Sequence, residues 1–392
     1  MKIAFVIYSP AISGGTFVIY EYVKSLARKG HEVVLVTDFN VNDNWIEWYP
    51  EAKEFTFINF KEAENITFDI AIATWWKTVS RIHELNSKKY IYFVQSYEPY
   101  FVSEQEYSLR RYIESTYIRG LPVITEATWI KDFLKDRFNV EAKLVKNGIR
   151  KDIFKLEGPA FREREPGKLR VLIEGPIDVS FKNVPRTVEL CKRANADEIW
   201  MLTSSEIENY PGVDKVFSKV SVFDTPLIYR SCDVLVKLSY VEGMFGPPLE
   251  MFHCGGTAIV YDVTGHDEYI IDKKNALVVK RDDEDTVVEY IKKLKKDNIL
   301  LNRLKKGAEL TAQKWHSWEK AVDEFEQSLN TISKEYSPSR MDLIAKDRFF
   351  YDWHNIHNIN LSEIRHSRLY KIEVHFRKLK IRLRICINKI TK

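Results

Sequence analysis

The sequence predicts an α/β protein with two doubly wound, Rossmann-like domains that face each other across a cleft, followed by a basic C-terminal extension. Short apolar strand candidates alternate with helical patterns in the first part of the chain, and a second series of the same kind begins at residue 169. Such alternation is typical of parallel sheets covered by helices. Residues 157–168, polar and rich in Gly and Pro, separate the two series. We expect domains at 1–160 and 161–336, and the extension at 337–392.

The first series opens with an apolar strand at residues 2–8, which runs into a turn-rich loop containing Gly14 and Gly15. A helical pattern follows over residues 17–28, and Gly30 is its stop signal. The other strand candidates of this half are residues 32–37, 54–60, 69–74, 90–95, 122–125 and 142–145.

The second series has the same character, and we expect its last helix to return towards the N-terminal domain. Helical patterns dominate from residue 286 to about residue 333. The strand candidates are residues 169–174, 198–203, 216–220, 234–239, 257–262 and 276–279.

Composition favours an intracellular globular protein. Of the 392 residues, 45% are hydrophobic and 30% are charged, so disorder is not expected. The cysteines Cys191, Cys232, Cys254 and Cys386 are widely spaced, which favours a reducing compartment and no zinc site. No secretory signal and no apolar run of about 18 residues is visible. We expect a cytoplasmic protein.

The extension differs in charge from the rest of the chain. Residues 337–392 contain 13 Lys/Arg against 5 Asp/Glu, a net charge of +8, whereas the whole chain carries +4. The body is therefore mildly acidic. In the extension, apolar residues follow a helical stripe, although residues 379–387 also alternate as in a strand; we favour the helix. The stripe consists of Ile372, Phe376, Leu379, Leu383, Ile387 and Ile390.

The most informative stretch is residues 241–256. Glu242 and Glu250 stand eight positions apart, after a buried strand candidate and around a glycine turn. Pro247 then starts a helix, where a missing amide hydrogen is tolerated. A strand that runs into a glycine turn and a helix N-terminus is the outline of an anion-binding site, because unpaired N–H groups and the helix dipole converge there.

With these residues in place, the chain resembles the GT-B glycosyltransferases, and among them the large retaining family 4. The spacing of Glu242 and Glu250 is that family's Glu-x7-Glu motif. The resemblance covers about residues 1–335. Further matches in the same order are Gly14-Gly15, Gly30-His31-Glu32-Val33, Asn147-Gly148-Ile149 with Asp152 and Phe154, Gly265 to Glu268, Asn275-Ala276-Leu277, and Trp318-Glu319.

A narrower resemblance lies in the N-terminal half. Residues 73–78 and 92–101 are similar to a subgroup that includes the rhamnosyltransferase of S-layer glycan assembly. The C-terminal half is closer to the general family pattern. The subgroup resemblance therefore bears on the acceptor side more than on the donor, and rhamnose is one candidate sugar.

The resemblance implies that the C-terminal domain binds a nucleotide sugar and that the N-terminal domain binds the acceptor. Glu250 would accept hydrogen bonds from the ribose hydroxyls, and Glu242 would hold a hydroxyl of the donor sugar. Lys182 would neutralise the leaving diphosphate. The amides of Gly243, Met244, Phe245 and Gly246 would meet sugar and phosphate oxygens, and Gly14 and Gly15 would let the N-terminal loop approach the donor.

Each of these residues has a plainer interpretation. A glutamate in a first helical turn is often only a partner of the helix dipole, and Lys182 is otherwise a solvated loop lysine. On the acceptor side we expect Gln95, Tyr97 and Glu98 at a strand end that faces the cleft. Glu98, held extended by the following proline, is either a group that orients or deprotonates the acceptor hydroxyl or a structural carboxylate.

The chain departs from the family pattern at two points. Pro176 follows Gly175 where the family has an arginine for the diphosphate, and Arg186 is a candidate substitute. The histidine that the family often carries near residues 95–98 is absent. The paired aromatics Trp75 and Trp76 either stack on acceptor sugars or belong to the core.

These features predict a retaining, metal-independent glycosyltransferase of the hexosyltransferase type, acting in bacterial surface polysaccharide biosynthesis. It would move a sugar from a dTDP-, UDP- or GDP-linked donor to a glycan or lipid-linked acceptor, without a cofactor. Two alternatives stay open: a non-catalytic nucleotide-sugar-binding or scaffold subunit, and a sugar-nucleotide epimerase.

The extension carries its own hypothesis. A basic segment with an apolar stripe can lie on an anionic membrane, which would place the protein at the inner face of the cell membrane. The alternatives are docking to a protein partner and packing on the N-terminal domain. Nucleic acid is not an expected partner, because the acidic body offers no continuing basic groove.

Overall fold

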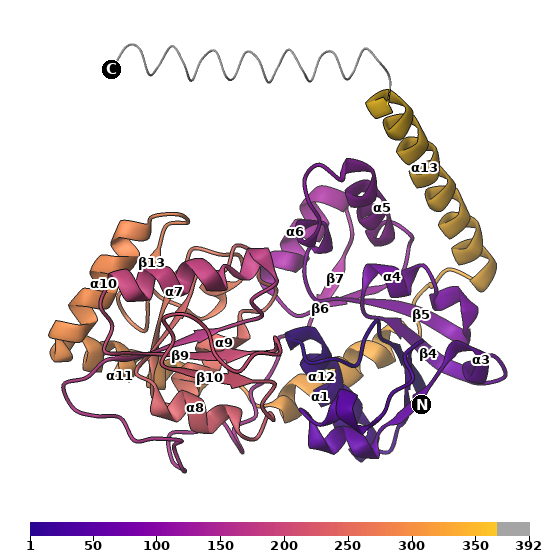
Figure 1. Cartoon of the computed structure of the whole chain (residues 1–392). Helices are drawn as coiled ribbons and strands as arrows, with labels where there is room; N and C mark the ends of the chain where they lie inside the picture. Colours follow the sequence, from indigo (N-terminus) through magenta and orange to yellow (C-terminus); the bar gives the residue numbers. More distant parts are fainter. Residues whose placement is uncertain (367–392) are drawn as a thin grey trace.

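The computed structural model describes residues 1–366, and the side chains of residues 1–358. It confirms the expected architecture: two parallel β-sheets, each covered by helices, form two Rossmann-like domains (Figure 1). The N-terminal domain is drawn in indigo and purple in Figure 1, and the C-terminal domain in magenta and orange.

The N-terminal sheet has the strand order β3-β2-β1-β4-β5-β6-β7, and every pair is parallel. The strand candidates match these elements, with ends that differ by a few residues. The strands are β1 (Lys2–Val6), β2 (Glu32–Val36), β3 (Thr56–Ile58), β4 (Thr67–Ala73), β5 (Asn86–Val94), β6 (Val123–Thr125) and β7 (Ala142–Leu144).

The C-terminal sheet has the order β10-β9-β8-β11-β12-β13, again with parallel pairs. The central neighbours β8 and β11 lie at the point where the strand order changes direction, which is where doubly wound folds bind ligands. The strands are β8 (Arg170–Glu174), β9 (Glu198–Thr203), β10 (Lys215–Ser218), β11 (Val234–Lys237), β12 (Thr257–Tyr261) and β13 (Leu277–Val279).

Helices connect the strands and cover both sheets (Figure 1). Those before β8 are α1 (Gly14–Arg28), α2 (Asp43–Ile46), α3 (Phe60–Ala63), α4 (Trp76–Val79), α5 (Tyr107–Tyr117) and α6 (Thr128–Phe138). Those after β8 are α7 (Val184–Arg193), α8 (Thr225–Ser231), α9 (Gly246–His253), α10 (Glu284–Lys296), α11 (Asn298–Lys314), α12 (Trp318–Ile332) and α13 (Arg340–His366). Short 3-10 helices are η1 (Pro50–Glu54), η2 (Ile82–Glu84), η3 (Glu98–Phe101), η4 (Ser180–Lys182) and η5 (His266–Glu268).

Helix α1 begins three residues earlier than its periodicity indicates. Gly14 and Gly15 form its first turn and do not lie in the loop before it. Ser13 caps this turn, because its hydroxyl oxygen accepts a hydrogen bond from the Thr16 amide at 3.1 Å. Glycines carry no apolar side chain, so hydrophobic periodicity cannot detect a first turn that contains them. The predicted helix start is therefore late.

The last helix of the second half, α12, packs on the N-terminal sheet. Its Phe325 stacks on Tyr22 of α1, with 4.1 Å between the ring centroids, and lies within the buried core of β1, β4 and β5. The chain therefore crosses between the domains twice. The two crossings touch at Gly148, where an added Cβ would lie 2.4 Å from the Trp318 amide nitrogen.

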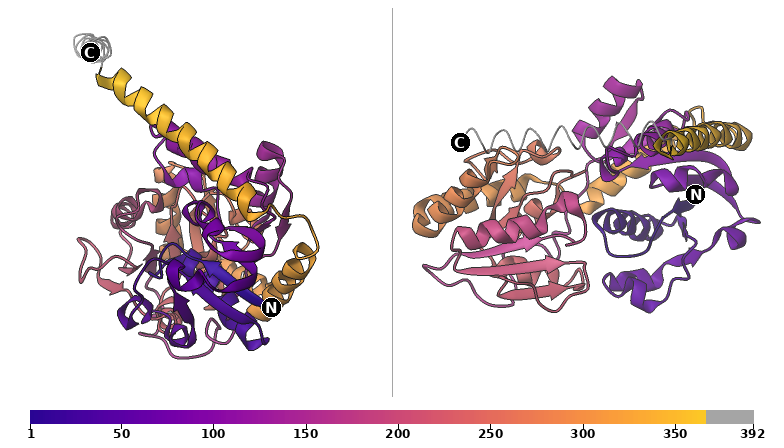
Figure 2. Two further views of the ribbon diagram at one scale, coloured as in Figure 1. Left: turned by 90° about the vertical axis from the view of Figure 1, so that its right-hand side faces the viewer. Right: turned by 45° about the horizontal axis from the view of Figure 1, so that its top comes forward.

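Helix α13, the described part of the extension, packs on the N-terminal domain beside α5 (Figures 1 and 2). Leu343 is buried, and Lys346 donates a hydrogen bond to the Arg119 carbonyl at 2.7 Å. Near the other end of α5, the His354 ring nitrogen Nδ1 lies 2.8 Å from the Ser108 hydroxyl. The predicted apolar stripe at residues 372–390 lies outside the described residues. No helix within residues 1–366 is long and apolar enough to span a bilayer.

Candidate active site

The site is built where β8 and β11 end. Lys182 in η4 and Glu242 in the turn after β11 form a bidentate ion pair, with Nζ 2.9 Å from Oε1 and 2.8 Å from Oε2. Two hydrogen bonds to backbone carbonyls hold η4 against the end of β11: the Tyr240 amide donates to the Phe181 carbonyl, and the Asn183 side chain donates to the Leu238 carbonyl. The structure thus brings the two residues that we expected to be catalytic into direct contact.

A second lysine lies beneath this pair. Lys237, the last residue of β11, is 2% exposed, and its Nζ lies 2.5 Å from Glu174 Oε2 and 3.6 Å from Glu242 Oε1. Burial of Glu242 by itself raises its pKa, but Lys182 and Lys237 outweigh burial and leave that pKa below its ordinary value. Glu242 is therefore ionised at neutral pH.

Glu250 occupies the middle of α9, one helical turn beyond Pro247. Burial, assisted by the negative charge of Glu174, raises its pKa to about 7, against the opposing effects of Tyr229 and Lys237. A group with this pKa changes its protonation state within the physiological range, and only its ionised form offers two full acceptor oxygens.

The turn Glu242–Gly246 contacts the N-terminal domain. The Trp129 indole donates to the Gly243 carbonyl at 2.9 Å, and the Met244 amide donates to Glu126 Oε1 at 3.1 Å. A Cβ at Gly243 would lie 2.0 Å from the Gln95 carbonyl oxygen, so a side chain cannot be accommodated there. The two domains meet at the same turn that carries the ion pair.

Glu126 is a buried carboxylate of the N-terminal domain, 5% exposed. Burial raises its pKa to about 7, although hydrogen bonds from Asn147, Met244 and Gln95 act in the opposite direction. Its Oε2 accepts from the Asn147 side chain at 2.9 Å, where the chain crosses between the domains. Glu126 thus links the crossing segment to the turn after β11.

Of the three acceptor-side candidates, Gln95 alone lies at the domain contact. Its side-chain amide donates to the Gly15 carbonyl at 3.1 Å, and its Oε1 would be 2.9 Å from a Cβ at Gly15. At Gly14, by contrast, no atom lies within 4 Å of an added Cβ. Gly15 therefore meets Gln95, and Gly14 borders open space.

Tyr97 and Glu98 point into the N-terminal domain. The Tyr97 hydroxyl contacts Glu114, and Glu98 is 1% exposed, with its Oε2 accepting from the Trp76 amide and the Tyr92 hydroxyl. We expected Glu98 to be extended at a strand end, because Pro99 follows it. In the structure Glu98 instead begins the 3-10 helix η3. Burial raises the pKa of Glu98 to about 8, so it is a neutral structural acid at pH 7.

The remaining residues of the turn contribute mainly backbone. Phe245 is fully buried, and its carbonyl accepts from the Tyr269 hydroxyl. Met244 is half-buried against the same core, and the Gly246 amide donates back to the Met244 carbonyl at 2.9 Å. The side chains of Met244 and Phe245 are thus anchors that fix the path of the turn.

Arg186, the candidate for the missing arginine, is engaged elsewhere. Its guanidinium pairs with Glu284 of α10 and with Glu189 of its own helix. Lys237, in contrast, lies close to the place where the family arginine is replaced by Pro176. Its Nζ is 3.8 Å from a Cβ placed at the preceding residue, Gly175. Sequence reasoning missed Lys237, Glu174 and Glu126.

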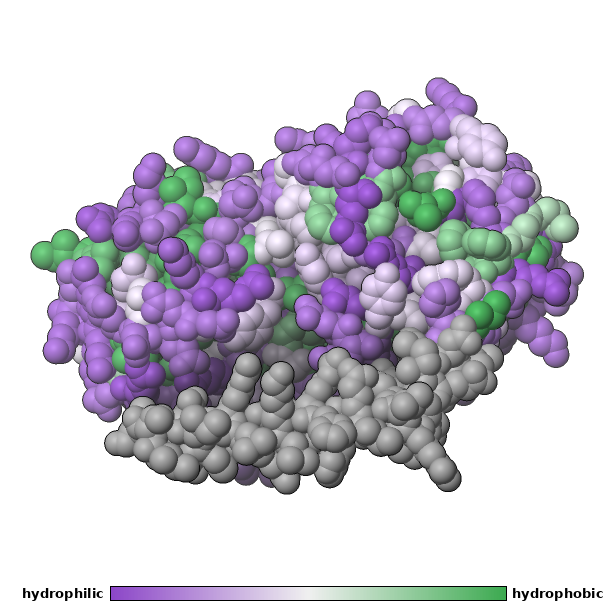
Figure 3. Space-filling model, turned by 90° about the horizontal axis from the view of Figure 1, so that it is seen from above, coloured by the Kyte–Doolittle hydropathy of each residue, from purple (hydrophilic) through white to green (hydrophobic). Residues whose placement is uncertain are grey.

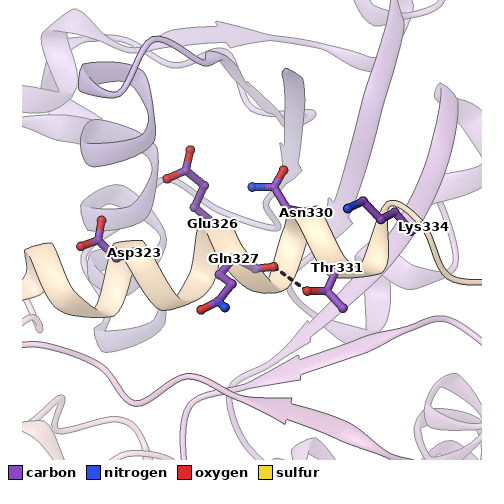
Figure 4. Close-up of a pocket in the computed structure, with 6 residues that line it drawn as sticks. All are labelled: Asp323, Glu326, Gln327, Asn330, Thr331 and Lys334. Carbon is purple, nitrogen blue, oxygen red and sulfur yellow. Dashed lines mark hydrogen bonds between the residues drawn. The ribbon is translucent and has the colours of Figure 1, made fainter.

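One surface hollow lies apart from this site. It has a volume of about 400 Å³ and is lined by the outer face of α12 (Figure 4). None of the predicted site residues borders it, and Glu326 there pairs with Lys29 and His31. Within residues 1–358, whose side chains are described, no three His, Cys, Asp or Glu side chains gather in a way that would hold a metal ion.

Comparison with known proteins agrees with this geometry. The family model described as glycosyl transferases group 1 matches residues 204–311, which include the turn, α9 and Glu250. The comparison with curated sequences found no match.

Solved structures show the same GT-B fold. Sucrose-phosphate synthase from Thermosynechococcus elongatus is 17% identical with a TM-score of 0.66, over 85% of this chain and 99% of that one. HepE from Anabaena, solved with UDP-glucose, is 12% identical with a TM-score of 0.68, over 84% and 100%. WaaG, a glycosyltransferase involved in lipopolysaccharide biosynthesis, is 14% identical with a TM-score of 0.57, over 85% and 100%.

Proposed function

We propose, from the premise that the chain is a GT-B glycosyltransferase with a group 1 domain, that it transfers a sugar with retention of anomeric configuration from a nucleotide sugar to a glycan or lipid-linked acceptor. The observation that carries this proposal is the Lys182–Glu242 ion pair, which stands at the switch point of the C-terminal sheet and at the domain contact. The pathway we propose is bacterial surface polysaccharide biosynthesis.

Lys182 serves the leaving group. When the bond from the anomeric carbon to the phosphate oxygen breaks, negative charge grows on the diphosphate, and a nearby ammonium stabilises it. The side chain of Lys182 is 22% exposed, so it can turn from Glu242 towards a ligand. No metal ion is needed for this step in our proposal.

Glu250 and Glu242 hold the two ends of the donor. The ionised Glu250 accepts hydrogen bonds from the ribose hydroxyls, and Glu242 holds a hydroxyl of the sugar. A site that hydrogen-bonds hydroxyl groups discriminates strongly against analogues that lack them, because its buried polar groups are then left unpaired. These two carboxylates therefore select the donor.

Retention follows from front-face departure. The acceptor oxygen bonds to the anomeric carbon on the face from which the diphosphate leaves, and the acceptor proton passes to a leaving phosphate oxygen. Glu98 does not serve as the base in this proposal, because it is buried and neutral at pH 7. The reaction then requires no carboxylate nucleophile.

A nucleotide-sugar panel tests the proposal. Full-length protein is incubated with UDP-glucose, GDP- and dTDP-linked sugars, including dTDP-rhamnose, and release of the nucleoside diphosphate is measured with and without glycan acceptors. Turnover with one donor, abolished in Glu242→Gln, supports the proposal and excludes a non-catalytic subunit. No turnover with any donor, or an inverted product by NMR, contradicts it.

The sugar and the acceptor are the finer part of the proposal. The rhamnosyltransferase-like residues at 73–78 and 92–101 support dTDP-rhamnose. The fold shared with HepE in complex with UDP-glucose supports UDP-glucose as its competitor. The ratio of kcat/KM for the two donors decides between them. The fold shared with WaaG, a glycosyltransferase involved in lipopolysaccharide biosynthesis, supports a lipid-linked glycan as the acceptor.

We also propose that the extension binds an anionic membrane, which would suit a lipid-linked acceptor. The face in Figure 3 is mostly hydrophilic, with hydrophobic side chains in small groups. Residues 367–392 carry 9 Lys/Arg and 1 Asp/Glu, and each basic residue at an anionic surface contributes about 1 kcal/mol. Flotation with anionic vesicles should be lost in a chain that ends at residue 366, which keeps α13. Equal flotation of both chains removes the membrane proposal.

A further inference from the structure

Four charged groups form a cluster where β8 and β11 end. Lys182 and Lys237 supply two positive charges, and Glu174 and Glu242 supply two negative charges. Lys237 joins the cluster, because its Nζ reaches Glu174 at 2.5 Å and Glu242 at 3.6 Å. The four formal charges sum to zero.

Lys237 is the least exposed member of the cluster, and its place in the strand is unusual. It continues the apolar run Val234–Val236 and is 2% exposed, whereas the side chain of Lys182 is 22% exposed. A buried ammonium is tolerated only when paired, so Lys237 is fixed between its carboxylates. Lys182 is thus the more exposed cation of the pair and Lys237 the buried one.

A nucleotide diphosphate changes this balance. Lys182 forms both short contacts to Glu242, so its departure towards the phosphates would leave a buried carboxylate with one remaining cation. An uncompensated buried charge is strongly destabilising. Lys237 already lies 3.6 Å from Glu242 Oε1 and needs only a small shift to bond it.

We propose that Lys237 is a positioning residue that keeps Glu242 ionised and in place while Lys182 turns to the diphosphate of the donor. This inference rests on the proposed function and deepens it, because it assigns a different role to each of the two lysines. One lysine meets the leaving group, and the other takes over the carboxylate that the first has released. The chain thereby works without an arginine at position 176.

The first test needs no ligand. Replacement of Lys182 by Met imitates its departure, and thermal unfolding is measured for Lys182→Met, Lys237→Met and the double variant. Glu174 loses its partner both in Lys237→Met and in the double variant. The stability lost through the unpaired Glu174 is therefore the same in both and cancels in the double-mutant cycle. We expect the double variant to lose about 4 °C or more beyond the sum of the single losses.

A triple variant identifies the group responsible. Adding Glu242→Gln to the double variant removes the unpaired charge, and most of the excess loss should disappear. Losses that simply add, or an excess that Glu242→Gln leaves unchanged, overturn the inference. Neither result depends on which donor the protein uses.

The second test separates positioning from direct contact. Calorimetry with UDP, GDP and dTDP measures nucleotide affinity, and turnover is followed with the corresponding sugar. Lys182→Met should lose about tenfold or more in affinity, because a charge-assisted contact is removed. Lys237→Met should keep the affinity within about threefold while kcat falls about 100-fold.

Equal losses of affinity in both variants would show that Lys237 contacts the diphosphate directly, and would overturn the positioning role. If the unmodified protein binds none of the three nucleotides, the proposed function fails, and the unfolding cycle still decides whether the two lysines share Glu242.

Discussion

Replacing Gly243 by alanine should keep the two domains apart. A Cβ at this position would lie 2.0 Å from the Gln95 carbonyl oxygen and 3.0 Å from Glu126 Oε1, and both of these residues belong to the N-terminal domain. The φ angle of Gly243 is not among the positive ones, so alanine fits the local backbone. The obstacle is therefore the opposite domain and not the turn itself.

The displacement can be estimated from contact distances. Carbon and oxygen atoms rest at about 3.5 Å, so the contact at 2.0 Å must open by about 1.5 Å. Such a shift breaks the hydrogen bond from Trp129 to the Gly243 carbonyl, now 2.9 Å, and the one from Met244 to Glu126, now 3.1 Å. A misplacement of about 1 Å costs about 100-fold in rate, so kcat should fall at least that far.

Turnover and solution scattering together test this reasoning. Gly243→Ala should unfold at nearly the same temperature as the unmodified protein, because opening the cleft relieves the clash, and its radius of gyration should increase. Gly246→Ala is the matched control for shape, since no atom lies within 4 Å of its added Cβ. Unchanged turnover and scattering for Gly243→Ala would refute the cross-domain contact.

Three further predictions concern single side chains. The pKa of Glu250 is about 7, and we have proposed that its ionised form accepts the ribose hydroxyls, so nucleotide affinity measured by calorimetry should weaken as pH falls below 7, and Glu250→Gln should abolish this pH dependence. Burial raises the folded-state pKa of Glu98 to about 8, so the stability it contributes is present below about pH 4.5 and is lost as pH rises through 8. Thermal unfolding of Glu98→Gln should show less loss over that range, and an identical pH profile would contradict the assignment. Phe101 of the N-terminal domain contacts Phe181 of the C-terminal domain with ring centroids 4.9 Å apart, so Phe101→Ala should lower kcat/KM by about three- to tenfold with little change in unfolding temperature.

The fold was largely predictable because its strands are apolar. Buried parallel strands have hydrophobic residues on both faces, so runs such as β11 and β12 stand out without any knowledge of the fold. Short elements such as α2 and α3 were missed, since four residues are too few to show a period. The early start of α1 was missed because glycines carry no hydrophobic signal.

Only part of the site could be predicted from the sequence, because some of its residues are far apart along the chain. Glu242 and Glu250 share one local motif, but Glu126 meets Met244 from 118 positions away, and no spacing rule reaches that far. Lys237 did leave a signal. A lysine that continues an apolar strand must be paired if it is buried, and that condition predicts a nearby carboxylate before the partner is known.

The two sides of the site are therefore positioned in different ways, one by the C-terminal domain and the other by its contact with the N-terminal domain. The C-terminal domain alone positions the proposed donor side, because Lys182, Lys237 and Glu242 lie at or just after the ends of the adjacent strands β8 and β11. The opposite side exists only when the domains touch, and their approach depends on the paired crossings at Gly148 and Trp318. Substitutions at the crossings should thus alter turnover without altering nucleotide affinity. The Glu242–Glu250 motif can be recognised in the sequence because it is local, whereas the opposite side of the site joins residues such as Glu126 and Met244, which are 118 positions apart.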